Sequence, residues 1–130
     1  MITKLKSIVL LVHNQDEALD FFTKKLGFEV HTDAKFGEDN RWLTVTVPGQ
    51  KDLEIALEHA RTPEAKALVG KQMNGGTSLL GFYTNNIVKD VETFRMNGVK
   101  TIGEISDMPY GKFIVFEDLY GNRFYLHEDK

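Results

Sequence analysis

Hydrophobic and polar positions follow the same strand–helix–strand pattern in two parts of the chain. In the first part, an apolar run at residues 8–12 precedes a turn, an amphipathic helix that ends at Gly27, and a second strand. The second part, residues 79–102, repeats this order and ends its helix at Gly98. Asn14 in the first turn corresponds to Asn86 in the second at an offset of about 72 residues, which predicts an internal structural duplication.

The first half of the chain predicts the element order βαβββ. Strands are expected at residues 2–12, 28–32, 41–47 and 53–57, with a polar loop between residues 35 and 40. Asn14 is a natural N-cap for the helix, and Glu17 can complete a capping box. One face of this helix carries the apolar side chains of Ala18, Leu19, Phe22 and Leu26.

The second half repeats the order after a connector at residues 61–76. Thr62 and Pro63 predict the N-cap and first residue of a short helix over 64–69, and Met73 to Gly76 predict a flexible joint. Strands are then expected at residues 77–84, 99–105, 112–117 and 123–127, with Asn86 capping a helix between the first two. We therefore divide a single domain, 1–130, into module one (1–60), a linker helix (61–76) and module two (77–130).

This element order predicts an α+β fold. Four strands with one helix cover only one face of their sheet, so the two modules are expected to pair. The pairing predicts a curved eight-stranded mixed sheet around a concave cleft, with the helices outside. Because side chains alternate along a strand, the positions expected to face the cleft are Ser7, Val9, Leu11, His13, Glu54, Ala56, Glu58, Leu79, Gly81, Tyr83, Arg123, Tyr125 and His127.

The composition excludes several classes of function. The net charge is −3 and the basic residues do not cluster, which argues against a nucleic-acid partner, since such partners require Lys and Arg to neutralise phosphates. The chain has no cysteine, so disulfides, a thiol nucleophile and a zinc–thiolate site are excluded. The first apolar run is too short to span a bilayer or to form a signal peptide. We therefore expect a cytoplasmic protein without a membrane partner.

Three stretches carry a resemblance to a known family: LLVHNQDEALDFFTKKLGFEV at residues 10–30, RWLTVTVPGQKDLEIAL at 41–57, and GKFIVFEDLYGNRFYLHE at 111–128. Together with the two βαβββ modules, they resemble the vicinal oxygen chelate superfamily. This superfamily holds glyoxalase I, extradiol dioxygenases, and fosfomycin- and bleomycin-resistance proteins. The resemblance implies a glyoxalase-like fold, but members that share this architecture run different chemistry.

The resemblance also implies where a metal would bind. The family's metal site takes one inward residue, mostly His, Glu or Gln, from each of four strands. These positions fall on Ser7, Glu54, Leu79 and Tyr125. Only Glu54 keeps a suitable ligand, and one carboxylate does not hold a divalent ion tightly. We therefore predict no metal site at these positions and no cofactor.

Several candidate residues have two interpretations. Glu54 is either a general base, with its pKa raised by an apolar cleft, or a carboxylate paired with Arg41 or Arg123. The aromatic residues Tyr83, Tyr125 and Trp42 are either walls of a binding cleft or core. His127 and His13, near strand ends, either bind a ligand or act as acid–base groups, or they are solvated or hydrogen-bonded. Tyr110 and Phe113 border a turn that is either a lid or a plain hairpin.

We predict a binding protein that holds a small, aromatic or polar organic molecule in the cleft without the usual metal site. The alternative is a superfamily enzyme, a lyase, isomerase or dioxygenase such as a lactoylglutathione-lyase-like protein, with a rearranged metal or acid–base site around Glu54 and His127. A structural dimerisation module is a third alternative, and the resemblance implies a homodimer. The predicted ligand-binding residues are Ser7, Trp42, Glu54, Leu79, Tyr83, Arg123, Tyr125 and His127.

Overall fold

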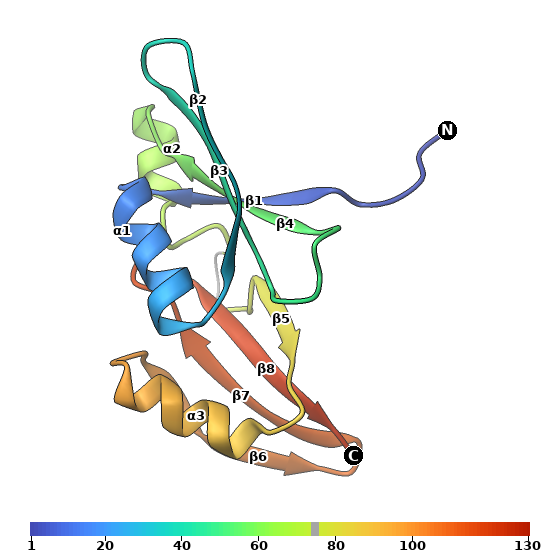
Figure 1. Ribbon diagram of the computed structural model, residues 1–130. Coiled ribbons are helices and arrows are strands. Elements are labelled where there is room, and N and C mark those ends of the chain that lie inside the picture. Colours follow the sequence, from blue (N-terminus) through green and yellow to red (C-terminus); the bar gives the residue numbers. More distant parts are fainter. Residues whose placement is uncertain (74–75) are drawn as a thin grey trace. The chain divides into compact units, whose positions relative to one another are not determined.

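The computed structural model describes residues 1–73 and 76–130, which form two compact units (Figure 1). Unit 1 is Met1–Val69 and unit 2 is Gly70–Lys130. The connector helix α2 (Pro63–Leu68) therefore belongs to unit 1. Within the joint predicted from Met73 to Gly76, Asn74 and Gly75 lie outside the described residues.

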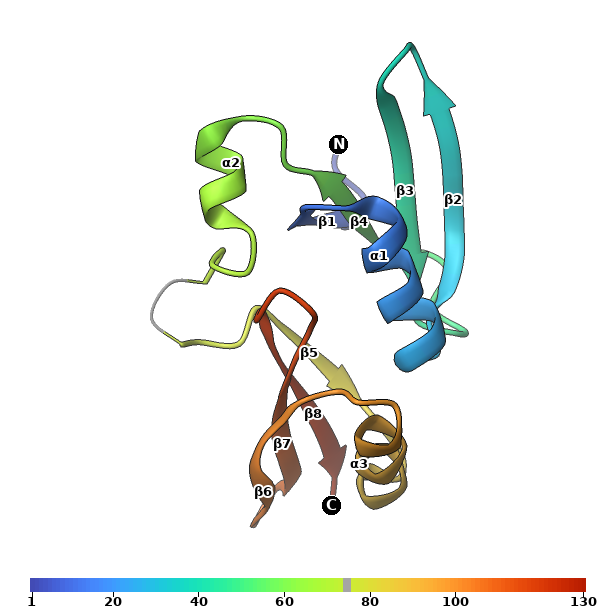
Figure 2. The ribbon, with the colours of Figure 1, turned by 90° about the vertical axis from the view of Figure 1, so that its left-hand side faces the viewer.

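Unit 1 has the predicted order βαβββ. It contains β1 (Ser7–Val12), α1 (Gln15–Asp20), the π-helical turn η1 (Phe21–Lys25), β2 (Glu29–Phe36), β3 (Asn40–Thr46), β4 (Glu54–His59) and α2. The strands lie in the order β1-β4-β3-β2. β1 runs parallel to β4, whereas the other pairs are antiparallel, so the sheet is mixed. Figure 2 shows α1 against this sheet, where it contacts β4.

Unit 2 repeats this topology. It contains β5 (Leu80–Tyr83), α3 (Ile87–Met96), β6 (Thr101–Met108), β7 (Gly111–Glu117) and β8 (Arg123–Asp129), with the sheet order β5-β8-β7-β6. β5 runs parallel to β8, as β1 does to β4. The described residues thus form eight strands, hydrogen-bonded as two four-stranded mixed sheets. The predicted α+β class and the two βαβββ modules are confirmed.

Side-chain caps begin α1, α2 and α3 where the sequence predicted them. The backbone N–H of Glu17 donates to Asn14 Oδ1 at 2.9 Å, that of Ala65 to Thr62 Oγ1 at 3.0 Å, and that of Lys89 to Asn86 Oδ1 at 3.2 Å. Each bond satisfies an N–H that has no partner inside its helix. The π-helical turn after Asp20 was not predicted. It buries Phe21 beside Phe22, with ring centroids 5.3 Å apart.

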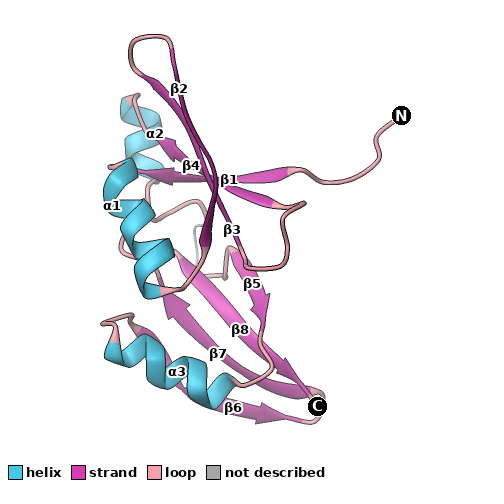
Figure 3. Cartoon of the chain, in the orientation of Figure 1, coloured by secondary structure: helices cyan, strands magenta, loops and turns pink. Residues whose placement is uncertain are grey.

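Several predicted strand boundaries are wrong, and hydrogen-bond pairing explains those of β1, β2 and β6. β1 begins at Ser7 because its pairing with β4 begins at the Ser7–Glu54 pair. β2 continues through the expected loop to Phe36, which pairs with Asn40 across a tight turn; Figure 3 shows this hairpin. β6 extends to Met108 because its hairpin closes at the Met108–Gly111 pair. This is the plain hairpin alternative for the turn that contains Tyr110.

Each unit has its own hydrophobic core between its helix and one face of its sheet. In unit 1, Leu10 and Val12 are buried on the face that packs against the helical segment carrying Phe22. In unit 2, Phe116 is the centre of the core, with ring centroids 4.9 Å from Phe94 on α3 and 5.5 Å from Phe124 on β8. Within the described residues, no helix is long and apolar enough to cross a membrane.

Candidate functional site

The face of each sheet opposite its core carries the predicted site residues. On the unit-1 sheet, the side chains of Ser7 and Glu54 are neighbours because these two residues pair in register. On the unit-2 sheet, Gly81 pairs with Tyr125, and Tyr83 pairs with His127. Strand alternation places these residues on the side of each sheet opposite the core side chains of the same strands, such as Leu10, Ile55 and Phe124. We call these two surfaces the open face of unit 1 and the open face of unit 2.

Glu54 is the centre of a polar network on the open face of unit 1. The residue is 5% exposed, and each of its two carboxylate oxygens has a polar partner. Oε2 lies 2.9 Å from Lys6 Nζ. Oε1 accepts a hydrogen bond from Thr44 Oγ1 at 2.8 Å and lies 3.1 Å from His31 Nδ1. A buried carboxylate is thus compensated by one cation and two further polar groups.

This network corrects both predicted interpretations of Glu54. The Lys6 ammonium lowers the pKa of Glu54 below its ordinary value of 4.5 despite burial, and Thr44 and His31 act in the same direction. The expected raised pKa is therefore wrong, whereas a role of Glu54 as a general base stays a prediction. The expected pairing is correct in kind but wrong in partner, because Arg41 bonds to Asp33 and Asp16, and Arg123 lies beside Glu117.

Trp42 joins this network through Lys6, whose ammonium lies 5.7 Å from the centroid of the Trp42 ring. Trp42 is partly buried, so its side chain is neither a full member of the core nor a fully exposed surface of a cleft. Sequence reasoning missed Lys6, His31 and Thr44 as members of the network. Alternation along β3 could have identified Thr44, but His31 lies where the pairing of β2 shifts register, and such shifts leave no simple sequence pattern.

The open face of unit 2 is aromatic. The ring of Tyr125 lies against the backbone of β5 at Gly81, where a Cβ would overlap ring carbons and the hydroxyl of Tyr125. The absence of a side chain at Gly81 therefore allows the ring to lie across the neighbouring strand. Tyr125 is 45% exposed and Tyr83 is 78% exposed, so both rings present apolar surface.

His127 lies among aromatic rings on this face. Its ring centroid is 5.7 Å from that of Tyr83 and 6.2 Å from that of Tyr110. Nδ1 lies 3.1 Å from Asp129 Oδ1. Nε2 is buried without a hydrogen-bond partner and faces Gly111, where a Cβ would come within 2.7 Å of it. The environment of His127 is thus more enclosed than the solvated strand end that one interpretation expected.

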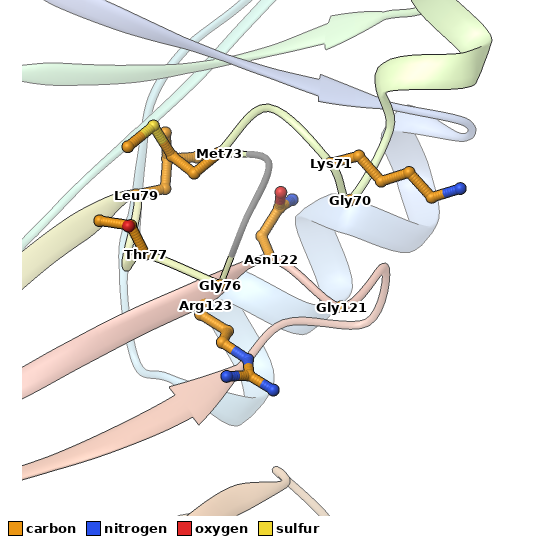
Figure 4. Close-up of a pocket in the computed structure, with 9 residues that line it drawn as sticks. All are labelled: Gly70, Lys71, Met73, Gly76, Thr77, Leu79, Gly121, Asn122 and Arg123. Carbon is orange, nitrogen blue, oxygen red and sulfur yellow. The ribbon is translucent and has the colours of Figure 1, made fainter.

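A pocket of about 220 Å³ adjoins the start of β5 and β8 in unit 2. Figure 4 shows its lining residues, which are Gly70, Lys71, Met73, Gly76, Thr77, Leu79, Gly121, Asn122 and Arg123. Two of the predicted ligand-binding residues, Leu79 and Arg123, thus line one pocket. They are also joined by a backbone hydrogen bond from Leu79 N–H to Arg123 C=O at 2.7 Å.

A second pocket, of about 200 Å³, lies at the start of α1 in unit 1. Its lining residues are His13, Asn14, Gln15, Asp16, Arg41 and His59. The guanidinium of Arg41 is already bonded to Asp33 at 2.8 Å and to Asp16 at 2.7 Å. These carboxylates raise the pKa of Arg41, and Arg41 in turn lowers that of Asp33. Because its cation is engaged, this pocket is a weaker candidate for ligand binding.

The four positions assigned by the resemblance to a metal do not fit one. Leu79 has no donor atom, and Ser7 and neutral Tyr125 are weak donors for a divalent transition metal. The remaining carboxylate, Glu54, holds the Lys6 ammonium at 2.9 Å. Across residues 1–73 and 76–130, no group of three His, Cys, Asp or Glu side chains is placed to hold a metal ion.

Comparisons with known proteins agree with this architecture. The family model of the Glyoxalase/Bleomycin resistance protein/Dioxygenase superfamily matches residues 4–126. An uncharacterized protein of Shewanella frigidimarina (strain NCIMB 400) is 36% identical over 116 residues, covering 88% of this chain and 85% of the relative. The crystal structure of UcmS2 has a TM-score of 0.85 at 32% identity and 98% coverage of both chains. That of TnmS3, an antibiotic binding protein from Streptomyces sp. CB03234, has a TM-score of 0.78 at 25% identity, covering 99% of this chain and 98% of TnmS3.

Proposed function

Because the chain belongs to the glyoxalase/bleomycin resistance protein/dioxygenase superfamily, we propose that it is a binding protein for a small aromatic organic molecule. The ligand stacks on the open face of unit 2, against Tyr125 and Tyr83. The observation that carries this proposal is the ring of Tyr125, which lies across Gly81 and remains 45% exposed. Flat aromatic surfaces of this kind provide contact area at little cost in side-chain entropy.

Two further findings support a binding role. TnmS3, which shares this fold at 25% identity, is described as an antibiotic binding protein. The donor set at the family's metal positions also lacks the ligands for metal-assisted chemistry, whereas binding by stacking requires none. Binding of the ligand in a cleft shared by both modules, with Ser7, Trp42 and Glu54 on one side, stays a prediction.

The binding proposal can be tested by a thermal-shift screen with aromatic metabolites and antibiotics. Hits should raise the melting temperature of the wild-type protein, because a ligand that binds only the folded state stabilises it. Tyr125→Leu should abolish these shifts. Phe36→Leu is the matched control, because Phe36 is an exposed aromatic residue on β2 of unit 1. Shifts that survive Tyr125→Leu would contradict the proposed surface, and no shift across a broad panel would contradict the binding role.

A catalytic role is the second candidate, and the contact between His31 and Glu54 at 3.1 Å favours it. A carboxylate and an imidazole in contact can move a proton, although Lys6 keeps the pKa of Glu54 low. Turnover of the hemithioacetal of methylglyoxal and glutathione, lost in His31→Phe, would support this role. Absence of turnover, together with a substoichiometric divalent metal content in the purified protein, would exclude a glyoxalase-type reaction.

We also propose that the protein is a homodimer, as the family resemblance implies. Sedimentation equilibrium tests this proposal directly: a mass of one chain at all concentrations would contradict it.

A further inference from the structure

Two residues that line the pocket of unit 2 lie close in sequence to its aromatic open face. Arg123 precedes Tyr125 by two residues on β8, and Leu79, just before β5, precedes Gly81 by two residues. Residues two apart on a strand point to the same face and lie about 7 Å from each other. The span of an aromatic ring that carries a substituent is comparable to this spacing, so one molecule can contact both Tyr125 and Arg123.

The charged side chains that line this pocket are basic. Among the described lining residues, Lys71 and Arg123 are basic and none is acidic. Figure 4 shows the Lys71 ammonium pointing away from Leu79, whereas Arg123 extends below Gly76. Arg123, which precedes Tyr125 on the same strand, is therefore the candidate contact for a ligand, and Lys71 adds to the positive field.

Arg123 keeps hydrogen-bonding capacity despite its acidic neighbour. Its Nε lies 3.7 Å from Glu117 Oε1, which is beyond hydrogen-bonding distance, and its side chain is 41% exposed. The guanidinium can therefore present a pair of parallel N–H donors, the geometry that binds carboxylate, sulfonate and phosphate groups. Glu117 also lies 3.7 Å from Lys100 Nζ, which offsets its negative charge.

We infer that the ligand of the open face of unit 2 is an aromatic molecule that carries an anionic group. Its ring stacks on Tyr125, and its anion binds the guanidinium of Arg123. This inference rests on the proposed function, because it assigns a ligand class to the same surface.

Two fluorescent dyes that differ by one anionic group test this inference. Anilinonaphthalene sulfonate is aromatic and anionic, and phenylnaphthylamine is the same ring system without the sulfonate. Fluorescence titration of the wild-type protein should give tighter binding of the anionic dye by about tenfold or more, the usual contribution of a hydrogen bond to a charged group. Arg123→Gln should remove this advantage and leave the affinity for the neutral dye within about twofold.

The matched control is Arg95→Gln, which removes the same charge from α3 of unit 2, where Arg95 lies beside Glu104. It should leave both affinities unchanged. Equal loss of anionic-dye binding in Arg95→Gln and Arg123→Gln would overturn the inference, because the effect would then be general attraction. Equal wild-type affinities for the two dyes, with both weakened by Tyr125→Leu, would also overturn it and leave the proposed function intact. Dye binding that is absent, or that does not respond to Tyr125→Leu, would overturn both.

Discussion

The two open faces are built on the same topology but carry opposite chemistry. On unit 1, the Glu54 carboxylate is enclosed by Lys6, Thr44 and His31, so its hydrogen-bonding capacity is used within the protein. On unit 2, the open face carries Tyr125, an exposed ring that lies over Gly81. The comparison shows that a duplicated fold can keep its core pattern while the opposite faces of its two sheets differ. In unit 1 this face carries polar groups that bond to one another, and in unit 2 it carries exposed aromatic rings that suit a ligand.

The largest expected effect on stability comes from breaking the network of unit 1. Glu54→Leu removes the acceptor of the buried Thr44 hydroxyl and the partner of Lys6. We expect the free energy of unfolding to fall by about 2–3 kcal/mol, because a buried donor then lacks a partner. Urea denaturation measures this loss. Glu58→Leu, on the same strand and face, is the control and should change the free energy by less than about 0.5 kcal/mol; similar losses in both variants would contradict the special role of the network.

The second prediction compares Glu54 with Asp118, a buried carboxylate in unit 2. Lys6 lowers the pKa of Glu54 below 4.5, whereas burial raises the pKa of Asp118 above 3.8 despite hydrogen bonds from the Asn122 side chain and from backbone N–H groups. The stability that Glu54 contributes is present above pH 4.5 and is lost as the pH falls toward its folded pKa. The contribution of Asp118 has the opposite sign: it is greatest below pH 3.8 and is lost as the pH rises through the raised pKa.

Unfolding free energies measured by urea between about pH 6 and pH 3 separate the two contributions. Relative to the wild-type protein, Glu54→Gln should flatten the loss of stability in acid. Asp118→Asn should make that loss steeper, because it removes the group whose contribution grows as the pH falls. If the two variants changed the slope in the same direction, the contrast between these carboxylates would be wrong.

The sequence predicted the repeated topology well because the residues that begin a helix or alternate along a strand lie close together in the sequence. Asn14, Thr62 and Asn86 cap helices by bonding to N–H groups three residues on, and a local pattern can show this. Alternation also predicted which side of each strand Glu54 and Tyr125 occupy. The partners of these residues were not predictable, because they depend on contacts distant in sequence: Lys6 and Glu54 are 48 residues apart. The lowered pKa of Glu54 follows from that contact, so sequence reasoning assigned it the wrong direction.

The third prediction concerns the shape of the aromatic face. Gly81→Ala places a Cβ in the space that the Tyr125 ring occupies, so the ring must rotate away from β5. The end of a tyrosine side chain moves easily, so we expect less than about 1 kcal/mol of change in the free energy of unfolding. The affinity for a stacked aromatic ligand should nevertheless fall several-fold, because the platform is lost. Thermal-shift titration with the ligands found in the proposed screen measures this affinity. Unchanged affinity would show that the orientation of the Tyr125 ring does not matter for binding.

The smallest expected effect comes from the unpaired nitrogen of His127. A buried polar atom without a partner costs free energy, and Nε2 is such an atom in the described structure. His127→Phe replaces it with an aromatic ring of similar shape and leaves Asp129, whose side chain is mostly exposed, to be solvated. The two effects oppose each other, so we expect the free energy of unfolding to stay constant or rise by up to about 1 kcal/mol.

His127→Gln is the comparison variant. It keeps a polar group facing Gly111, so it should be less stable than the His127→Phe variant. A clear loss of stability in His127→Phe, with Gln tolerated, would mean that Nε2 has a partner in solution, and the open face of unit 2 would then have a polar anchor in addition to its stacking surface.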